Sequence, residues 1–220
     1  MVFCDIGGME GIDAIPFAKA GANGIVLDIL PGVLKRGLDR ARKLRLYNLD
    51  FLCASATALP FKTESFDLLT SFSVIDHLPS KTDAKKAIKE FSRVTNRNGH
   101  VVITIPNKLF LLGTLMMMFK MFLQPTSFFE QRFTPKELIL WCNEFGLKII
   151  TYDSKNPAII DEGIMENNMP KFVHKIPPSI LTPLFSLGIK LLRLSEKFEL
   201  YLLGARFGLA AVKKRITPIC

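Results

Sequence analysis

Short apolar stretches alternate with segments of helical periodicity along the first half of the chain. A short apolar run bounded by glycine or polar residues is typical of a strand, and apolar residues three or four positions apart are typical of an amphipathic helix. These patterns predict strands at residues 2–5, 24–27, 51–55, 66–72 and 100–105, with helices at 11–19, 31–43 and 81–94 between them. Because strands that alternate with helices form βαβ units, we expect a doubly wound, Rossmann-like α/β fold with a mostly parallel sheet.

The pattern changes after residue 106. Residues 109–123 are almost wholly apolar, yet they are fewer than the ~20 that a membrane-spanning helix needs. We expect a lid-like helix or an interfacial segment here, with ordinary core packing as the alternative. The amphipathic pattern of residues 182–203 predicts a second helix that is open to the same interpretations.

A further helix and two strands complete the predicted sheet. Thr134 is a suitable N-cap and Pro135 suits the first helical position, so the spacing predicts a helix to about residue 145, where Gly146 ends it. Strands follow at residues 147–152 and 206–212, and residues 156–178 are predicted to form a long loop. The sheet is therefore expected to have seven strands, with helical insertions.

The composition indicates a folded chain that is unusually apolar. Hydrophobic residues make up 49% and charged residues 22%, which excludes a disordered protein. The four cysteines are scattered and have no histidine at ligand spacing, so we expect neither disulfides nor a metal site. No basic segment followed by an apolar stretch and a cleavage site opens the chain, which favours a cytoplasmic protein over a secreted one.

The net charge of +9 raises the question of an anionic partner. The lysines and arginines are spread along predicted helices and in a cluster at 213–215, without the interleaved aromatic residues of a single-strand binder. We therefore expect solvated helix faces and no nucleic-acid partner, with peripheral contact at a membrane as the alternative. Nothing in the sequence predicts an oligomeric state.

Candidate chemistry begins where the first predicted strand ends. Asp5 closes this strand, and Gly7, Gly8 and Gly11 follow it before the first helix. Glycines at such a junction let the backbone approach a ligand closely, in the crevice where doubly wound sheets bind cofactors. The second strand ends in Asp28, whose two acceptor oxygens match the vicinal hydroxyls of a ribose. Together these features predict a site for an adenosine-type cofactor.

Two cofactor classes use such parts. A nicotinamide-dependent oxidoreductase needs the spacing G-x-G-x-x-G, and Met9 stands where that spacing requires glycine. A nicotinamide-dependent oxidoreductase therefore stays as an alternative, although the glycine spacing disfavours it.

The residues resemble the class I S-adenosylmethionine-dependent methyltransferases, whose first motif is similar to D-x-G-x-G-x-G and whose second strand ends in an acidic residue. Within that class, the chain is similar to the small-molecule subgroup that includes quinone-biosynthesis methyltransferases. The resemblance covers residues 1–153 in order, and it rests on the segments 5–11, 54–61, 65–71, 94–107, 133–138 and 145–147. It implies the class I methyltransferase fold, S-adenosylmethionine as cofactor and methylation of a small molecule. The apolar segments 109–123 and 182–203 favour a hydrophobic acceptor, because they can form an apolar cover over the pocket.

The resemblance also implies residue roles. Asp5 would orient the loop and the methionine amino group, Gly7 would let the cofactor lie against the backbone, and Asp28 would hold the ribose. The implied cofactor site comprises Asp5, Gly7, Gly8, Gly11, Asp28, Ile29, Ser55, Ala56, Thr57 and Ser73. Ser73 belongs to the segment 72–78, which would border the sulfonium and the acceptor.

Methyl transfer from a sulfonium needs mainly positioning, with a base only where the acceptor must lose a proton. His77 is the candidate base, with Asp76 beside it. The alternative is a histidine that only satisfies a turn at a strand end. In related enzymes an Asn-Pro-Pro-Tyr-like run after the fourth strand serves the amino groups of bases or of glutamine. No such run follows the fourth strand here, so the resemblance favours an oxygen or carbon acceptor over a nitrogen one.

Two positions depart from the family pattern. Met9 stands where a loop glycine is usual, and Ser55 stands where an aspartate usually accepts the adenine amino group. The chain also starts on its first predicted strand, as a truncated form would. These departures keep open a second class of function, a methyltransferase-like protein without catalysis that binds a partner or a membrane.

These assignments divide one domain, residues 1–220, into five parts, because a chain of this length can bury a single core. We expect a cofactor-binding half at 1–106, a lid-like insertion at 107–133, a late helix and strand at 134–153, a loop with an amphipathic helix at 154–204, and a final strand at 205–213.

Overall fold

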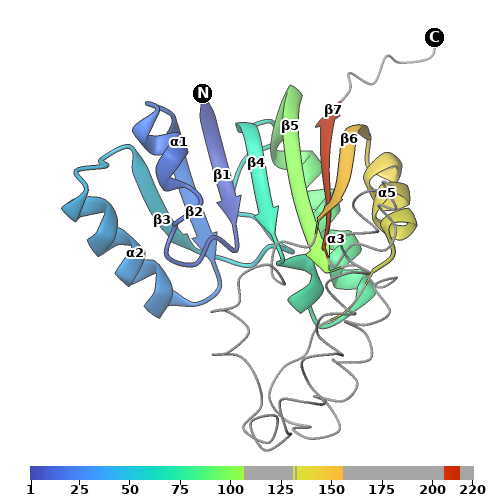
Figure 1. The fold of residues 1–220 in the computed structure, drawn as a ribbon, viewed down its shortest axis with the longest axis horizontal. Coiled ribbons are helices and arrows are strands. Elements are labelled where there is room, and N and C mark those ends of the chain that lie inside the picture. Colours follow the sequence, from blue (N-terminus) through green and yellow to red (C-terminus); the bar gives the residue numbers. More distant parts are fainter. Residues whose placement is uncertain (107–130, 132, 156–205, 214–220) are drawn as a thin grey trace, which may run out of the picture.

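A computed structural model describes residues 1–106, 131, 133–155 and 206–213 (Figure 1). The predicted lid-like helix at 109–123, the loop at 156–178 and the amphipathic helix at 182–203 lie outside the described residues. No helix among the described residues is long and apolar enough to cross a membrane.

The described residues form one seven-stranded sheet in the order β3-β2-β1-β4-β5-β7-β6. All strands run parallel except β7, which is antiparallel to both of its neighbours. The strands are β1 (Val2–Ile6), β2 (Asn23–Asp28), β3 (Leu49–Cys53), β4 (Phe66–Phe72), β5 (Thr95–Pro106), β6 (Leu147–Lys155) and β7 (Arg206–Lys213). The chain leaves β1 in one direction and returns to β4 on its other side, so the strand order reverses between β1 and β4.

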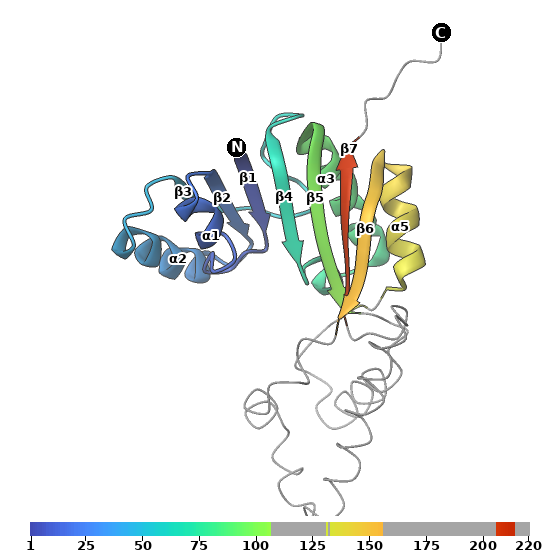
Figure 2. The same ribbon diagram turned by 45° about the horizontal axis from the view of Figure 1, so that its top comes forward.

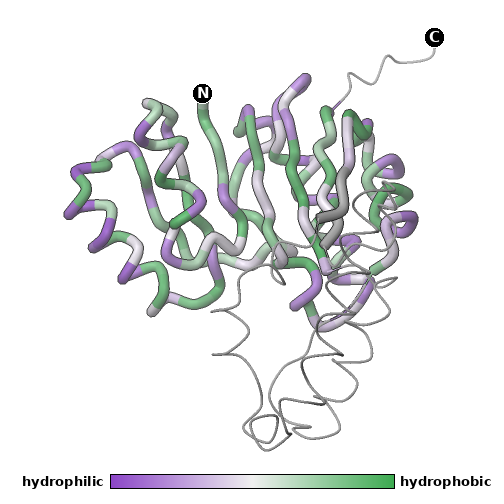
Figure 3. The backbone as a smooth tube through the Cα atoms, viewed as in Figure 1, coloured by the Kyte–Doolittle hydropathy of each residue, from purple (hydrophilic) through white to green (hydrophobic). Residues whose placement is uncertain are grey.

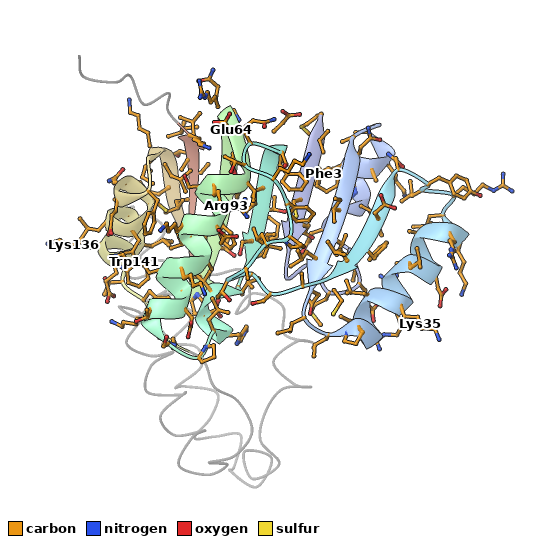
Figure 4. The ribbon with its side chains drawn as sticks, turned by 180° about the vertical axis from the view of Figure 1, so that it is seen from behind. Phe3, Lys35, Glu64, Arg93, Lys136 and Trp141 are labelled. Atoms are coloured by element: carbon orange, nitrogen blue, oxygen red, sulfur yellow. The ribbon has the colours of Figure 1, made fainter. Side chains whose placement is uncertain are left out.

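Helices cover both faces of the sheet, as the predicted fold requires. They are α1 (Ile15–Lys19), α2 (Pro31–Lys43), α3 (Lys81–Val94) and α5 (Pro135–Glu144), with a 3-10 turn, η1, at Ile75–His77. The predicted bounds of α2, α3 and β4 are confirmed. Seen from behind, α3 lies in front of the strands (Figure 4).

Alternation along the strands separates two hydrophobic clusters. Phe3 and Val26 pack with residues of α1 and α2, whereas Cys4 and Ile6 point to the opposite face and pack with residues of α3 and α5. Because successive strand residues point to opposite faces, β1 contributes to both clusters. Hydrophilic and hydrophobic residues alternate along α2 (Figure 3). Its buried residues Val33, Leu34 and Ala41 belong to the cluster on the sheet.

Several predicted boundaries were wrong, among them the end of β6, which lies at Lys155 rather than residue 152. Three of the differences have a local reason. The first helix begins at Ile15 rather than residue 11, because Gly11 has a φ of 71°, which is not helical. The strand β3 spans Leu49–Cys53 rather than 51–55, because Leu49 is buried opposite Gly24 and the backbone turns at Ser55. The strand β5 starts at Thr95, which pairs with Phe66 before an irregularity in the register.

The predicted start of α5 is confirmed at the level of hydrogen bonds. The Thr134 hydroxyl accepts from the Glu137 backbone N–H at 3.2 Å, and Glu137 Oε2 accepts from the Thr134 N–H at 2.8 Å. This capping box satisfies two backbone donors that the helix itself leaves unpaired. Gly146 follows the helix with a φ of 78°, the left-handed conformation expected of a glycine stop.

Candidate functional site

The loop after β1 folds over the end of β2. The Gly7 and Gly8 amides both donate to the Leu27 carbonyl oxygen, at 2.6 and 3.2 Å, and the Gly11 amide donates to the Gly8 carbonyl at 2.7 Å. Strands β1, β2 and β4 all end at the same edge of the sheet, the lower edge in Figure 1. The loop therefore lies at the carboxyl edge, where the strand order reverses and doubly wound sheets bind ligands.

Two of the loop glycines are required by their surroundings. Gly7 has a φ of 68°, and a Cβ at this position would overlap with the side chain of Val74. A Cβ at Gly8 would overlap with the Asp5 carboxylate and approach Val26 Cγ1 at 2.9 Å. At Gly7 and Gly8 the loop backbone is thus packed against β2 and the segment after β4, with no space for a side chain at these two positions.

Asp5 is buried beneath this loop. Its side chain is 1% exposed, and Oδ1 accepts a hydrogen bond from the Thr70 hydroxyl at 2.7 Å. Among the described residues, Oδ2 has no hydrogen-bond partner. Burial raises the pKa of Asp5 to about 6; the Thr70 hydrogen bond lowers it, and the charges of Asp13 and Asp28 raise it. An unpartnered buried carboxylate oxygen of this kind suits a cationic or N–H donor on a ligand.

Asp28 ties the loops of two strands together. Its Oδ2 accepts from the Met9 amide at 3.1 Å and its Oδ1 from the Leu30 amide at 2.9 Å. Each carboxylate oxygen can accept a second hydrogen bond, so two acceptor positions remain after the amides are counted. Ile29, between the strand end and Leu30, is 66% exposed at the same edge.

Beyond Asp28 lies the end of β3. Cys53 pairs with Asp28 in the register, and the Ala54 amide donates to the Asp28 carbonyl oxygen at 3.0 Å. The Ser55 and Thr57 hydroxyls are 2.9 Å apart, and the Thr57 amide donates to Ser55 Oγ at 3.2 Å. Ala56 between them is buried. The predicted hydroxyls of Ser55 and Thr57 and the predicted Asp28 carboxylate therefore follow one another along the carboxyl edge of the sheet.

The last group of predicted residues follows β4. Ser73 has a φ of 53°, and its Oγ is buried without a hydrogen-bond partner among the described residues. Its amide donates to the Thr104 carbonyl oxygen at 2.9 Å. Asp76 is 1% exposed, and its Oδ2 lies 3.5 Å from Nε2 of His77, whose side chain is 41% exposed. The histidine is thus accessible while the carboxylate beside it is buried.

Two contributors, Thr70 and Arg93, were not predicted, whereas a third, Val74, lies in the predicted segment 72–78. Val74 fills the space that Gly7 leaves, and Thr70 bonds to Asp5 from the neighbouring strand. Arg93, labelled on α3 in Figure 4, donates to the carbonyl oxygens of Leu59 and Phe61 at 2.9 and 2.7 Å. A polar residue in the apolar run of β4 was a signal for Thr70. No sequence pattern marked Arg93.

The arrangement fits an adenosine-type ligand along the carboxyl edge. A buried carboxylate lies under the β1 loop, a second carboxylate with free acceptor positions ends β2, and a pair of hydroxyls follows β3 (Figure 2 shows these strands side by side). Among the described residues, no group of three or more metal-ligating side chains is present.

Residues 4–103 match the model of a protein family described as "Methyltransferase domain". The demethylmenaquinone methyltransferase of Renibacterium salmoninarum is 38% identical over 100 residues, which cover 45% of this chain and 38% of that protein. The ubiquinone/menaquinone biosynthesis C-methyltransferase of Sinorhizobium fredii is 37% identical over 103 residues, covering 45% and 39%. The chain therefore spans about two fifths of the length of these curated relatives.

Solved structures share the fold. An S-adenosylmethionine-dependent methyltransferase from Methanosarcina mazei aligns with a TM-score of 0.67 at 17% identity, over 97% of this chain and 92% of that one. Magnesium protoporphyrin IX methyltransferase from Synechocystis aligns with a TM-score of 0.64 at 16% identity, over 96% and 74%. These alignments confirm the predicted class I methyltransferase fold.

Proposed function

We propose that the protein binds S-adenosylmethionine at the carboxyl edge of its sheet and transfers the methyl group to a small, lipophilic acceptor, because residues 4–103 match the model of a methyltransferase domain. The observation that carries this proposal is the convergence of Asp5, the glycine loop and Asp28 where the strand order reverses. The bound cofactor would supply a methyl carbon activated by its sulfonium.

Each group of the site has a task in this proposal. The unpartnered oxygen of Asp5 would accept from the amino group of the methionine moiety, since it is buried and close to the loop backbone. The free acceptor positions of Asp28 would receive the ribose hydroxyls. Ser55, Ala56 and Thr57 would lie beside the adenine, and Ile29 would cover it from the exposed side.

The residues after β4 would position the acceptor. His77 would take a proton from an acceptor hydroxyl or carbon acid, because its side chain is accessible and its Nε2 lies 3.5 Å from the Asp76 carboxylate, which would orient the ring. Ser73, with its buried hydroxyl, would lie between the cofactor and this pair. Alignment of donor and acceptor, rather than covalent catalysis, would supply most of the rate enhancement.

Two observations support a lipophilic acceptor. The relatives are named for demethylmenaquinone and for ubiquinone/menaquinone biosynthesis. Large apolar side chains are also exposed at the carboxyl edge: Met9 at 56%, Ile12 at 59%, Ile29 at 66% and Leu30 at 55%. An exposed apolar group of this kind marks a contact for an apolar ligand or a membrane surface. Peripheral membrane contact is proposed on the same ground, and co-sedimentation with anionic liposomes at low salt tests it.

Calorimetric titration with S-adenosylmethionine and S-adenosylhomocysteine tests the cofactor assignment. We expect micromolar binding by the wild type and a loss of at least about tenfold in Asp28→Asn, because one carboxylate acceptor becomes a donor. Asp50→Asn is the matched control, since Asp50 is an exposed aspartate on the adjacent strand and should leave binding unchanged. Absence of binding by a folded wild-type protein would contradict the proposal.

A further inference from the structure

The end of β3 is the part of the edge that a purine base would reach, and this inference rests on the proposed function. Cys53 pairs with Asp28, and the Ala54 amide donates to the Asp28 carbonyl oxygen at 3.0 Å. A nucleoside with its ribose hydroxyls on the Asp28 carboxylate and its remaining part over the β1 loop must extend its base away from β1, towards β3. Ser55 and Thr57 are the first side chains with hydrogen-bonding groups after that strand.

The Ser55 and Thr57 hydroxyls form a pair that can both donate and accept hydrogen bonds to a ligand. Their oxygens are 2.9 Å apart, and either of them can be the donor within the pair. Ser55 Oγ also accepts from the Thr57 amide at 3.2 Å. Each hydroxyl has one donor and two acceptor positions, so one O–H always remains to donate outwards and two acceptor positions always remain to receive.

We infer that this hydroxyl pair makes the site tolerant of the group at position 6 of the purine, so that it binds 6-oxo as well as 6-amino nucleosides. Towards a 6-amino group the pair accepts a hydrogen bond through a free lone pair. Towards a 6-oxo group it donates its outward O–H. The exchange needs only rotation of two O–H bonds, which leaves the heavy atoms in place.

A carboxylate at position 55 would behave differently. An ionised carboxylate accepts but cannot donate, so it suits an amino group and repels a carbonyl oxygen. Discrimination at position 6 would then be strong, because the rejected ligand leaves two acceptors facing each other. Ser55 is thus the residue that determines base selectivity in this site.

The segment that follows is held firmly, which keeps the pair in place. Leu59 donates its amide to Glu90 Oε2 at 2.9 Å, while Arg93 donates to the Leu59 carbonyl at 2.9 Å and to Glu90 at 2.7 Å. The Ala58 amide donates to the Ser55 carbonyl at 3.1 Å. These bonds anchor the turn to α3, so selectivity depends on the hydroxyls rather than on movement of the backbone.

Calorimetry with two ligands tests the inference. S-adenosylhomocysteine and S-inosylhomocysteine differ at position 6 and in the proton on N1. We expect wild-type dissociation constants within about tenfold of each other, and in Ser55→Asp a shift of the ratio by at least about tenfold towards the adenine ligand. Only residue 55 differs between the two proteins, so the change in this ratio reports how residue 55 interacts with the purine edge.

The possible results separate the two proposals. Absence of S-adenosylhomocysteine binding would contradict the proposed function, and the inference with it. Tight S-adenosylhomocysteine binding with more than about hundredfold weaker S-inosylhomocysteine binding, unchanged in Ser55→Asp, would overturn the inference alone. If Ser55→Asp does not fold, the double variant Ser55→Ala/Thr57→Val replaces it; we expect both ligands to weaken, and unchanged affinities would overturn the inference.

Discussion

Asp5 is a carboxyl group whose ionisation the folded protein opposes. It is 1% exposed, and burial is the main cause that raises its pKa from 3.8 to about 6. Between these values the folded state holds a proton that the unfolded state has released. Stability must therefore fall as pH rises from about 4 to 6, since the folded state binds more protons there.

The variant Asp5→Asn should remove this pH dependence. A neutral amide keeps an oxygen for the Thr70 hydroxyl and carries no charge. The free energy of unfolding of Asp5→Asn should therefore lack the decrease of about 2 kcal/mol that the wild type shows between pH 4 and 7. Urea denaturation at several pH values measures the difference. Asp50→Asn changes an exposed aspartate whose charge does not shift the pKa of Asp5, and it serves as the control. Parallel pH profiles for wild type and Asp5→Asn would show that burial does not shift this group.

Met9 is the second notable residue of the site. Its φ of 48° puts its backbone in the left-handed region, where glycine is favoured over residues with a side chain. The side chain is 56% exposed, and the amide still reaches the Asp28 carboxylate at 3.1 Å. The loop thus keeps its hydrogen bond to β2, although the left-handed conformation of Met9 destabilises the backbone by about 1 kcal/mol.

At the scale of elements, α5 depends on its first turn. Burial raises the pKa of Glu137, but hydrogen bonds from Lys81 and Thr134 outweigh it and lower the pKa to about 2. The ionised carboxylate therefore stabilises the folded state above pH 4.5, and this contribution is lost as pH falls towards 2.

Thr134→Ala removes the hydroxyl of the capping box. We expect a loss of about 1 kcal/mol in the free energy of unfolding at pH 7, because the Glu137 amide loses its acceptor and the Glu137 carboxylate loses a donor. Thr134→Ser keeps the hydroxyl and should cost little. Guanidinium denaturation of the wild type and the two variants decides whether the hydroxyl or the methyl group of Thr134 stabilises the helix. An equal loss of stability in both variants would point to packing of the methyl group.

At the scale of the molecule, the two halves of the sheet are built differently. Strands β1 to β5 pair in parallel, while β6 is joined to the described sheet only through the antiparallel β7. Leu209 of β7 is 2% exposed and belongs to the cluster that includes α3 and α5 residues.

Leu209→Ala should loosen one side of the molecule. We expect a loss of about 2 to 5 kcal/mol in stability and faster amide exchange in β6 and β7, because both strands depend on this packing. Exchange in β2, on the other side of β1, should change less. Hydrogen exchange followed by mass spectrometry measures both strands, and equal acceleration throughout would indicate that the sheet opens as a single unit.

Much of this architecture follows from local pattern. The alternation of apolar runs with helical periodicity predicted all seven strands and the four described helices, since buried parallel strands read as continuous apolar segments. Boundaries failed where a tertiary partner or a backbone angle decided them, as at Gly11 and Leu49. The antiparallel direction of β7 was not predicted, because strand direction is set by the chain path and not by hydropathy.

The candidate site was predictable to a similar degree. Asp5 and Asp28 lie at the carboxyl ends of β1 and β2, and the glycines follow β1. Because these strand ends meet at one edge, their proximity follows from the fold. The pairing of Ser55 with Thr57 and the use of both Asp28 oxygens by backbone amides depend on turn geometry that the residue types alone do not determine.

The position of β7 also has a consequence for synthesis on the ribosome. As the chain emerges, β1 to β5 can assemble in order, each strand beside one already made. β6 is made next, yet its place is one strand beyond β5, and the strand that fills the gap is made after it. Until β7 is released, β6 exposes unpaired backbone groups on both edges and is a target for chaperones or for another nascent chain. The strand β6 can join the sheet only once β7 pairs with both β5 and β6.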